Sequence, residues 1–109
     1  MADDVILNKA ASIERCLQRA CETAIDLAMY VVSQRKLGVP QDSRDAFSLL
    51  QTAGILSADL AQRMQRMVGF RNVAVHEYTR LNLEVVRTII TKQLDDFRIF
   101  SSTIVKACL

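Results

Sequence analysis

The sequence predicts an all-α fold, an up-and-down bundle of four or five helices with short loops. Its composition favours helices, because 50% of the 109 residues are hydrophobic but only 6% are aromatic, with three glycines, one proline and no tryptophan. Apolar residues also recur at steps of three and four along most of the chain, which is the spacing of a helix face. The length suits a single domain over residues 1–109, near the lower limit for an independent core.

The first helix is expected over residues 4–36. Glutamate, arginine and glutamine occupy much of the face opposite its apolar stripe, as in an amphipathic helix. Gly38 suits a C-cap, and Pro40 prevents the helix from continuing. The stripe consists of Ile13, Leu17, Ala20, Cys21, Ala24, Ala28, Val31 and Val32.

A short second helix follows, with Asp42 or Ser43 as its N-cap, an end near Thr52 and Gly54 closing it. Its apolar residues are Phe47, Leu49 and Leu50.

The third helix is predicted from about Ala58 to Tyr78 with Ser57 as its N-cap, and the last runs to the C-terminus with Asn82 as its N-cap. The core candidates of the third are Leu60, Met64, Met67, Val68 and Val75, and those of the last are Leu83, Val86, Ile90, Leu94, Phe97, Ile104 and Val105.

The charge pattern is compatible with phosphate binding but does not establish it. A net charge of +2 is too weak to diagnose nucleic-acid binding, although arginines outnumber lysines ten to four. Arg63, Arg66 and Arg71 fall on the predicted third helix, with Arg80 just beyond. Guanidinium groups suit bidentate phosphate contacts, but a solvated arginine-rich face is an equally good interpretation.

Cysteine usage and the absence of targeting signals predict a cytoplasmic protein. Cys16, Cys21 and Cys108 have no C-x-x-C spacing, so we expect no zinc site and no disulfide framework, but small buried hydrophobes in a reducing cytosol. The first residues are acidic, unlike a signal peptide, and no uncharged run approaches the 18 residues of a membrane span.

The octet at residues 71–78 holds the only histidine of the chain. Histidine is the only side chain whose unperturbed pKa lies near physiological pH, and Arg71 is a permanent cation suited to phosphate oxygens, so the pair of His76 and Arg71 suggests phosphodiester chemistry. Asn72 and His76 are one helical turn apart, whereas Arg71 and His76 differ by about 140° around the axis. They can converge if Arg71 curls round, if the helix is irregular, or if a second subunit contributes its copy.

The alternative is structural: His76 bonds a neighbouring helix, and Tyr78 is a half-buried aromatic. Because no glycine-rich phosphate loop, Ser-His-Asp arrangement or carboxylate cluster for a metal is present, any catalysis should be acid–base work without a metal or other cofactor.

The octet Arg71-Asn72-Val73-Ala74-Val75-His76-Glu77-Tyr78 resembles the R-x4-6-H motif of HEPN domains (higher eukaryotes and prokaryotes nucleotide-binding), and in particular the R-x4-H-x-Y signature of the HepT toxins. The resemblance extends to residues 67–70, 37–47 and 81–83, in order over nearly the whole chain.

The resemblance implies an all-α toxin of a type VII toxin–antitoxin system that cleaves RNA without a metal, as a homodimer. Arg71, His76 and Asn72 would be its catalytic residues. Its partner would be a minimal nucleotidyltransferase antitoxin of the MntA kind, which transfers AMP from ATP to the motif tyrosine, here Tyr78.

The chain departs from the HepT pattern near Cys16 and Leu17, where family members usually carry a loop and the start of another helix. The expected first helix is therefore open to division into two, and its length favours that interpretation.

Three classes of function remain in competition. In the first, His76 acts as general base on a ribose 2′-hydroxyl or as acid toward the leaving oxygen, Arg71 stabilises the phosphorane, and Asn72 orients either. In the second, the same groups form a non-catalytic module that binds a nucleotide or docks a partner. In the third, the chain is a structural helical adaptor, for which the whole octet is dispensable.

Overall fold

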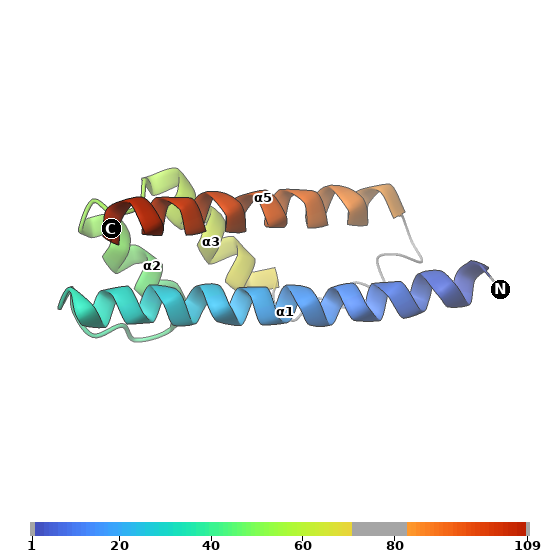
Figure 1. The fold of residues 1–109 in the computed structure, drawn as a ribbon, viewed down its shortest axis with the longest axis horizontal. Helices are drawn as coiled ribbons and strands as arrows, with labels where there is room; N and C mark the ends of the chain where they lie inside the picture. The colour runs from blue at the N-terminus through green and yellow to red at the C-terminus, as the bar shows by residue number, and fades with distance from the viewer. Residues whose placement is uncertain (1, 71–82, 109) are drawn as a thin grey trace.

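The computed structural model describes residues 2–70 and 83–108. This part of the chain contains four helices and no strand: α1 (Ala2–Gln34), α2 (Ser43–Thr52), α3 (Ala58–Phe70) and α5 (Leu83–Cys108). In Figure 1, α1 and α5 run in the same direction along the long axis, α3 runs the opposite way, and the short α2 lies beside α3. The all-α prediction is confirmed.

α1 is one continuous helix of 33 residues, so the division into two is not what the structure shows. At about 1.5 Å per residue such a helix is about 50 Å long. The longest dimension of the molecule is 52 Å, so α1 runs nearly its full length.

The end of α1 corrects the predicted cap. Lys36 N–H bonds Ser33 O at 3.2 Å and Leu37 N–H bonds Val32 O at 3.0 Å, the hydrogen-bond pattern of a Schellman motif. The left-handed residue of this motif is Lys36, with φ 53°, and not Gly38. Gly38 has φ 137° and belongs to the loop that follows.

The caps of α2 and the start of α3 agree with the sequence. Asp42 is the N-cap of α2 and accepts a 2.8 Å hydrogen bond from Asp45 N–H, while Gly54, with φ 79°, follows the helix end. Ser57 Oγ accepts from Leu60 N–H at 3.2 Å at the start of α3. The remainder of the predicted third helix, and the proposed cap Asn82, lie outside the described residues.

The core forms where α1, α2, α3 and α5 meet. The ring of Phe47 in α2 packs edge-on against Phe100 in α5, with centroids 5.7 Å apart and planes at 73°. The fully buried side chains of largest volume are Phe47, Phe100, Leu50, Met64, Val32 and Cys21.

Two of the core positions predicted for α5 are wrong. Leu94 and Val105 are 54% and 53% exposed, whereas Phe100, absent from the predicted stripe, is 1% exposed. Only Phe97 and Ile104 of that stripe pack in the described core, and Leu83 and Val86 lie outside the side chains described. The buried face is therefore rotated from the predicted one.

The cysteine prediction holds at one position and fails at two. Cys21 is buried, but Cys16 and Cys108 are exposed free thiols. Cys21 contributes to the core cluster as the small hydrophobe expected of it. In the described part of the chain, no helix is both long enough and apolar enough to cross a membrane.

Candidate functional site

The four predicted site residues, Arg71, Asn72, His76 and Tyr78, lie outside the described residues, as does Arg80. The structure describes the two helices on either side of them in sequence: α3 as far as Phe70, and α5 from Leu83. The structure therefore describes the two helices that flank the motif in sequence, and not the motif itself.

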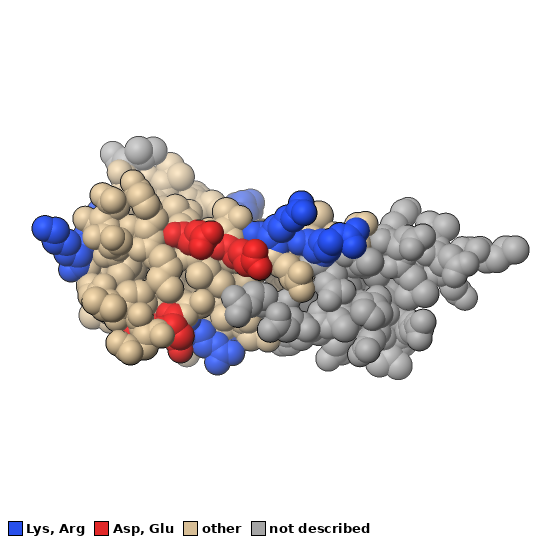
Figure 2. Space-filling view, turned by 90° about the horizontal axis from the view of Figure 1, so that it is seen from below, with Lys and Arg blue, Asp and Glu red and all other residues tan. Residues whose placement is uncertain are grey.

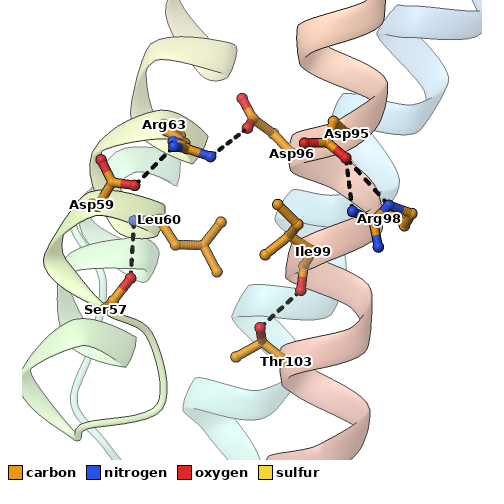
Figure 3. Close-up of polar contacts among 9 residues, drawn as sticks. All are labelled: Ser57, Asp59, Leu60, Arg63, Asp95, Asp96, Arg98, Ile99 and Thr103. Atoms are coloured by element: carbon orange, nitrogen blue, oxygen red, sulfur yellow. Dashed lines mark hydrogen bonds and ion pairs between the residues drawn. The ribbon is translucent and has the colours of Figure 1, made fainter.

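An ion-pair network joins α3 to α5. Arg63 contacts the Asp59 carboxylate at 3.1 Å within α3 and the Asp96 carboxylate of α5 at 3.5 Å. Figure 3 shows the Arg63 guanidinium between these two acids, on one side of the apolar contact zone that holds Leu60. Arg63 thus has a structural role that the sequence did not distinguish from phosphate binding.

Asp96 is the buried acid of this network, with only 7% of its surface exposed. Burial raises the pKa of its carboxyl above the ordinary value, and the charge and hydrogen bond of Arg63 counteract that rise. Neighbouring Asp95 raises the pKa further, while Lys92, one turn earlier on α5, lowers it. The network therefore joins the helices at the expense of desolvating a carboxylate.

A second polar link joins α2 to α3. The Gln65 side-chain amide donates to Arg44 O at 3.0 Å and to Ser48 Oγ at 2.7 Å, so one α3 side chain holds the first turns of α2. The Arg44 guanidinium then lies against Gly69, where an added Cβ would meet Arg44 Nη2 at 2.8 Å. This contact is two residues before Arg71 in sequence.

A cleft of about 430 Å³ opens between α3 and α5 beside the Arg63 network. Arg66 and Met67 line it from α3, and Lys92 and Gln93 line it from α5, together with the network residues. Arg66 and Lys92 are exposed, and among the described residues no carboxylate lies within ion-pair distance of either. Of the two described arginines considered for phosphate binding, Arg63 forms ion pairs with acids, whereas Arg66 lines the cleft without an ion pair to any described carboxylate.

The exposed face of α1 carries further charge. In Figure 2, basic side chains gather near the middle of the long axis, with acidic side chains beside them. The exposed charged residues along this helix change sign in the same way, from Arg15 and Arg19 to Glu22 and Asp26. This separation of charge had no part in the sequence prediction.

The fold and the motif together define an all-α protein of the HEPN class, with a helical frame that brackets an R-x4-H-x-Y octet. The model of the family described as ribonuclease HepT-like matches residues 7–104, and the chain belongs to that family. The resemblance seen in the sequence is confirmed.

Two characterised relatives carry the same family name. An mRNA nuclease HepT of Shewanella oneidensis is 36% identical over 129 aligned positions, covering 94% of this chain and 97% of the relative. A tRNA nuclease HepT of Aphanizomenon flos-aquae is 31% identical over 87 positions, covering 80% of this chain but only 59% of the relative. The Shewanella alignment has more positions than this chain has residues, so that relative carries residues with no counterpart here.

Solved structures give the same class. A toxin–antitoxin crystal structure with AMP-PNP contains a chain that is 40% identical, with a TM-score of 0.75, covering 87% of this chain and 72% of that one. A tri-AMPylated Shewanella oneidensis HEPN toxin in complex with its MNT antitoxin is 36% identical, with a TM-score of 0.69, covering 95% of this chain and 98% of that one. At 40% and 36% identity, this chain resembles these two chains in sequence as well as in fold.

Proposed function

We propose that this chain is the toxin of a type VII toxin–antitoxin system, a metal-independent endoribonuclease that acts in the cytoplasm. The observation that carries the proposal is the family match over residues 7–104, which contains the complete octet Arg71 to Tyr78. The match makes the chain a HepT-like ribonuclease, and the octet supplies the only imidazole with which such chemistry can work at neutral pH.

The proposed reaction is cleavage by the neighbouring ribose hydroxyl. His76 takes the proton of the 2′-hydroxyl as the 2′-oxygen attacks phosphorus, and the bond from phosphorus to the 5′-oxygen breaks. The leaving oxygen takes up a proton, and a 2′,3′-cyclic phosphate remains. Arg71 stabilises the charge on the phosphorane, and Asn72 orients His76 or the phosphate.

A homodimer is part of the proposal, because one histidine per chain is too few for separate acid and base roles. The described part of α5 supports a self-association surface. Leu94 and Val105 are both more than half exposed, and eleven residues bring them to nearly the same face of the helix. Light scattering of the purified chain at micromolar concentration should give twice the monomer mass, and a strict monomer would remove the shared-site version of the mechanism.

The partner proposed for this chain is a nucleotidyltransferase antitoxin of the MntA kind. The Shewanella toxin described above, 36% identical to this chain, is AMPylated and bound to such an antitoxin. We assign the acceptor here to Tyr78, whose phenol oxygen attacks the α-phosphorus of ATP and releases pyrophosphate. The adduct adds bulk and negative charge beside Arg71, so it excludes a substrate phosphate and interacts with the cation in its place.

Cleavage is tested with purified chain and labelled RNA in the presence of a metal chelator. Wild type should give products ending in 2′,3′-cyclic phosphate, and His76→Ala should give none while still binding the antitoxin. Arg71→Lys should also fail, because lysine keeps the charge but loses the bidentate fork. Absence of cleavage by wild type would instead support the non-catalytic binding module, whereas equal cleavage by wild type and His76→Ala would contradict the role of His76.

Modification is tested by mass spectrometry after incubation with the antitoxin and ATP. AMP should appear on Tyr78, and the circular dichroism of the modified chain should remain that of the helical fold. Tyr78→Phe should stay toxic and unmodified, because the ring survives without its acceptor hydroxyl. AMP on another residue, with Tyr78 bare and activity lost, would contradict the assignment.

A further inference from the structure

The cleft between α3 and α5 has two ends with different electrostatic character. At one end Arg63 lies between Asp59 and Asp96, so its charge is balanced by two acids. At the other end are Arg66 and Lys92, one from each helix, without an ion-pair partner in the described part of the chain. The lining therefore has three cations and two acids, and although Lys92 interacts electrostatically with Asp96 one turn away, neither Lys92 nor Arg66 forms an ion pair with a carboxylate in the described part of the chain.

The position of these two cations relates them to the motif. Arg66 is four residues before Phe70, the last described residue of α3, which corresponds to about 6 Å along a helix axis. Arg71 follows Phe70 directly. Lys92 lies on the facing wall, on the helix that resumes the described chain after the motif.

Two cations that face one cleft repel each other until an anion lies between them. A cleft with low-dielectric walls also concentrates the field of such charges. Arginine and lysine on opposite walls suit a tetrahedral phosphate, which accepts a guanidinium fork from one side and an ammonium group from the other. Gln93 adds a neutral donor on the α5 wall.

We propose that Arg66 and Lys92 form a subsite that binds a backbone phosphate of the RNA substrate next to the phosphate that is cleaved. The inference rests on the proposed ribonuclease function and adds to it where the RNA strand lies: along the α3–α5 cleft, toward Arg63 and Asp96. The two cations position the strand and take no part in proton transfer.

The test measures the salt dependence of binding to a single-stranded RNA with 2′-O-methyl groups, which lacks the attacking hydroxyl and is not cleaved. Each phosphate contact on a single strand contributes about 0.7 to the slope of log affinity against log salt. Between about 50 and about 200 mM KCl, wild type should therefore lose roughly 2.6-fold more affinity than Arg66→Gln or Lys92→Gln. It should lose roughly sevenfold more than the double variant.

Arg98→Gln is the matched control. Arg98 is also an exposed cation of α5, but it is paired with Asp95 at 2.8 Å and lies outside the cleft, so its slope should equal that of wild type. Arg66→Lys and Lys92→Arg should retain the wild-type slope, since a point cation suffices for counterion release. Thermal melting of every variant checks that the fold is intact.

Two results would overturn the subsite. One is a wild-type slope in the double variant. The other is an unchanged RNA slope with lost binding of the purified antitoxin, which would make the cleft a docking site for an acidic protein surface. Cleavage of unmodified RNA by wild type, measured in parallel, keeps the two proposals apart: its absence contradicts the ribonuclease function, whereas unchanged slopes with normal cleavage contradict only the subsite.

Discussion

Replacing Gly69 with alanine tests the contact between α2 and α3 that lies two residues before the motif in sequence. Gly69 belongs to α3, and alanine in place of glycine within a helix stabilises by about 0.5–1 kcal/mol. The new Cβ would, however, lie 2.8 Å from Arg44 Nη2, closer than such atoms approach. The atom in the way is the far end of a flexible side chain, so Arg44 can move at a cost of about 0.5–1.5 kcal/mol.

The two effects oppose each other in wild type, and removing Arg44 separates them. Gly69→Ala alone should change the free energy of unfolding by an amount between a gain of about 0.5 and a loss of about 1 kcal/mol, the range left when the cost is subtracted from the gain. In an Arg44→Ala background the same change should give the full gain of about 0.5–1 kcal/mol. The coupling between the two positions should therefore be at least about 0.5 kcal/mol, as for residues in contact.

Urea unfolding of the four proteins, followed by circular dichroism, measures this cycle. Gains from Gly69→Ala that agree within about 0.3 kcal/mol in the two backgrounds would refute the contact between Arg44 and Gly69. Loss of more than about 1 kcal/mol in both would instead show that α3 cannot hold an alanine there for a reason other than Arg44.

Three further perturbations test the fold. Phe47→Ala should lower the unfolding free energy by about 3–5 kcal/mol, because it empties a fully buried site against Phe100, and a loss under about 1 kcal/mol in urea unfolding would contradict that packing. Lys36→Gly should raise it by about 0.5–1 kcal/mol by relieving a left-handed residue, and a lower melting temperature would speak against this. The raised pKa of Asp96 means that its protonated form is favoured by folding. The stabilisation that the protonated Asp96 carboxyl adds to the free energy of unfolding is thus fully present below about pH 3.9, and it is lost as the pH rises through the raised pKa. Acidification should then stabilise wild type relative to Asp96→Asn, and the opposite trend in paired urea titrations would mean that Arg63 outweighs burial.

Local chemistry made the helix starts predictable, but not every helix end. Asp42 and Ser57 were expected as caps because a short side-chain acceptor next to free backbone N–H groups is a local signal. The sequence predicts Gly38 as the cap of α1 because glycine adopts positive φ most readily. The chain instead places Lys36 there, a choice that packing can enforce at about 1–2 kcal/mol.

The buried face of α5 shows why a helix can be predicted and its orientation missed. Apolar residues cover a wide arc of this helix, and periodicity alone does not say which part of the arc α2 and α3 will contact. The buried face is the one that carries Phe97, Phe100 and Ile104, and Leu94 and Val105 are exposed. Such a choice depends on contacts between residues far apart in sequence.

One part of the candidate site could likewise be predicted from the sequence, and another part could not. The motif from Arg71 to Tyr78 is contiguous, so its residue types and the family resemblance were available from the sequence. The α3–α5 cleft was not, because it depends on Arg63 meeting Asp96, 33 positions later, and on Arg66 facing Lys92. The ten arginines gave no local sign of which would be paired with an acid.

The shared direction of α1 and α5 makes the two chain ends unequal as attachment points for a fusion partner or a surface tether. In Figure 1 the N-terminus lies at the same end of the long axis as the start of α5, which immediately follows the motif segment, whereas the C-terminus lies at the opposite end. At that opposite end Arg35 donates to Ala107 O at 2.6 Å, so the last turn of α5 is held to the end of α1. A fluorescent protein or affinity matrix joined after α5 should therefore lie away from the end of the molecule where α5 begins, whereas one joined before α1 lies at that end.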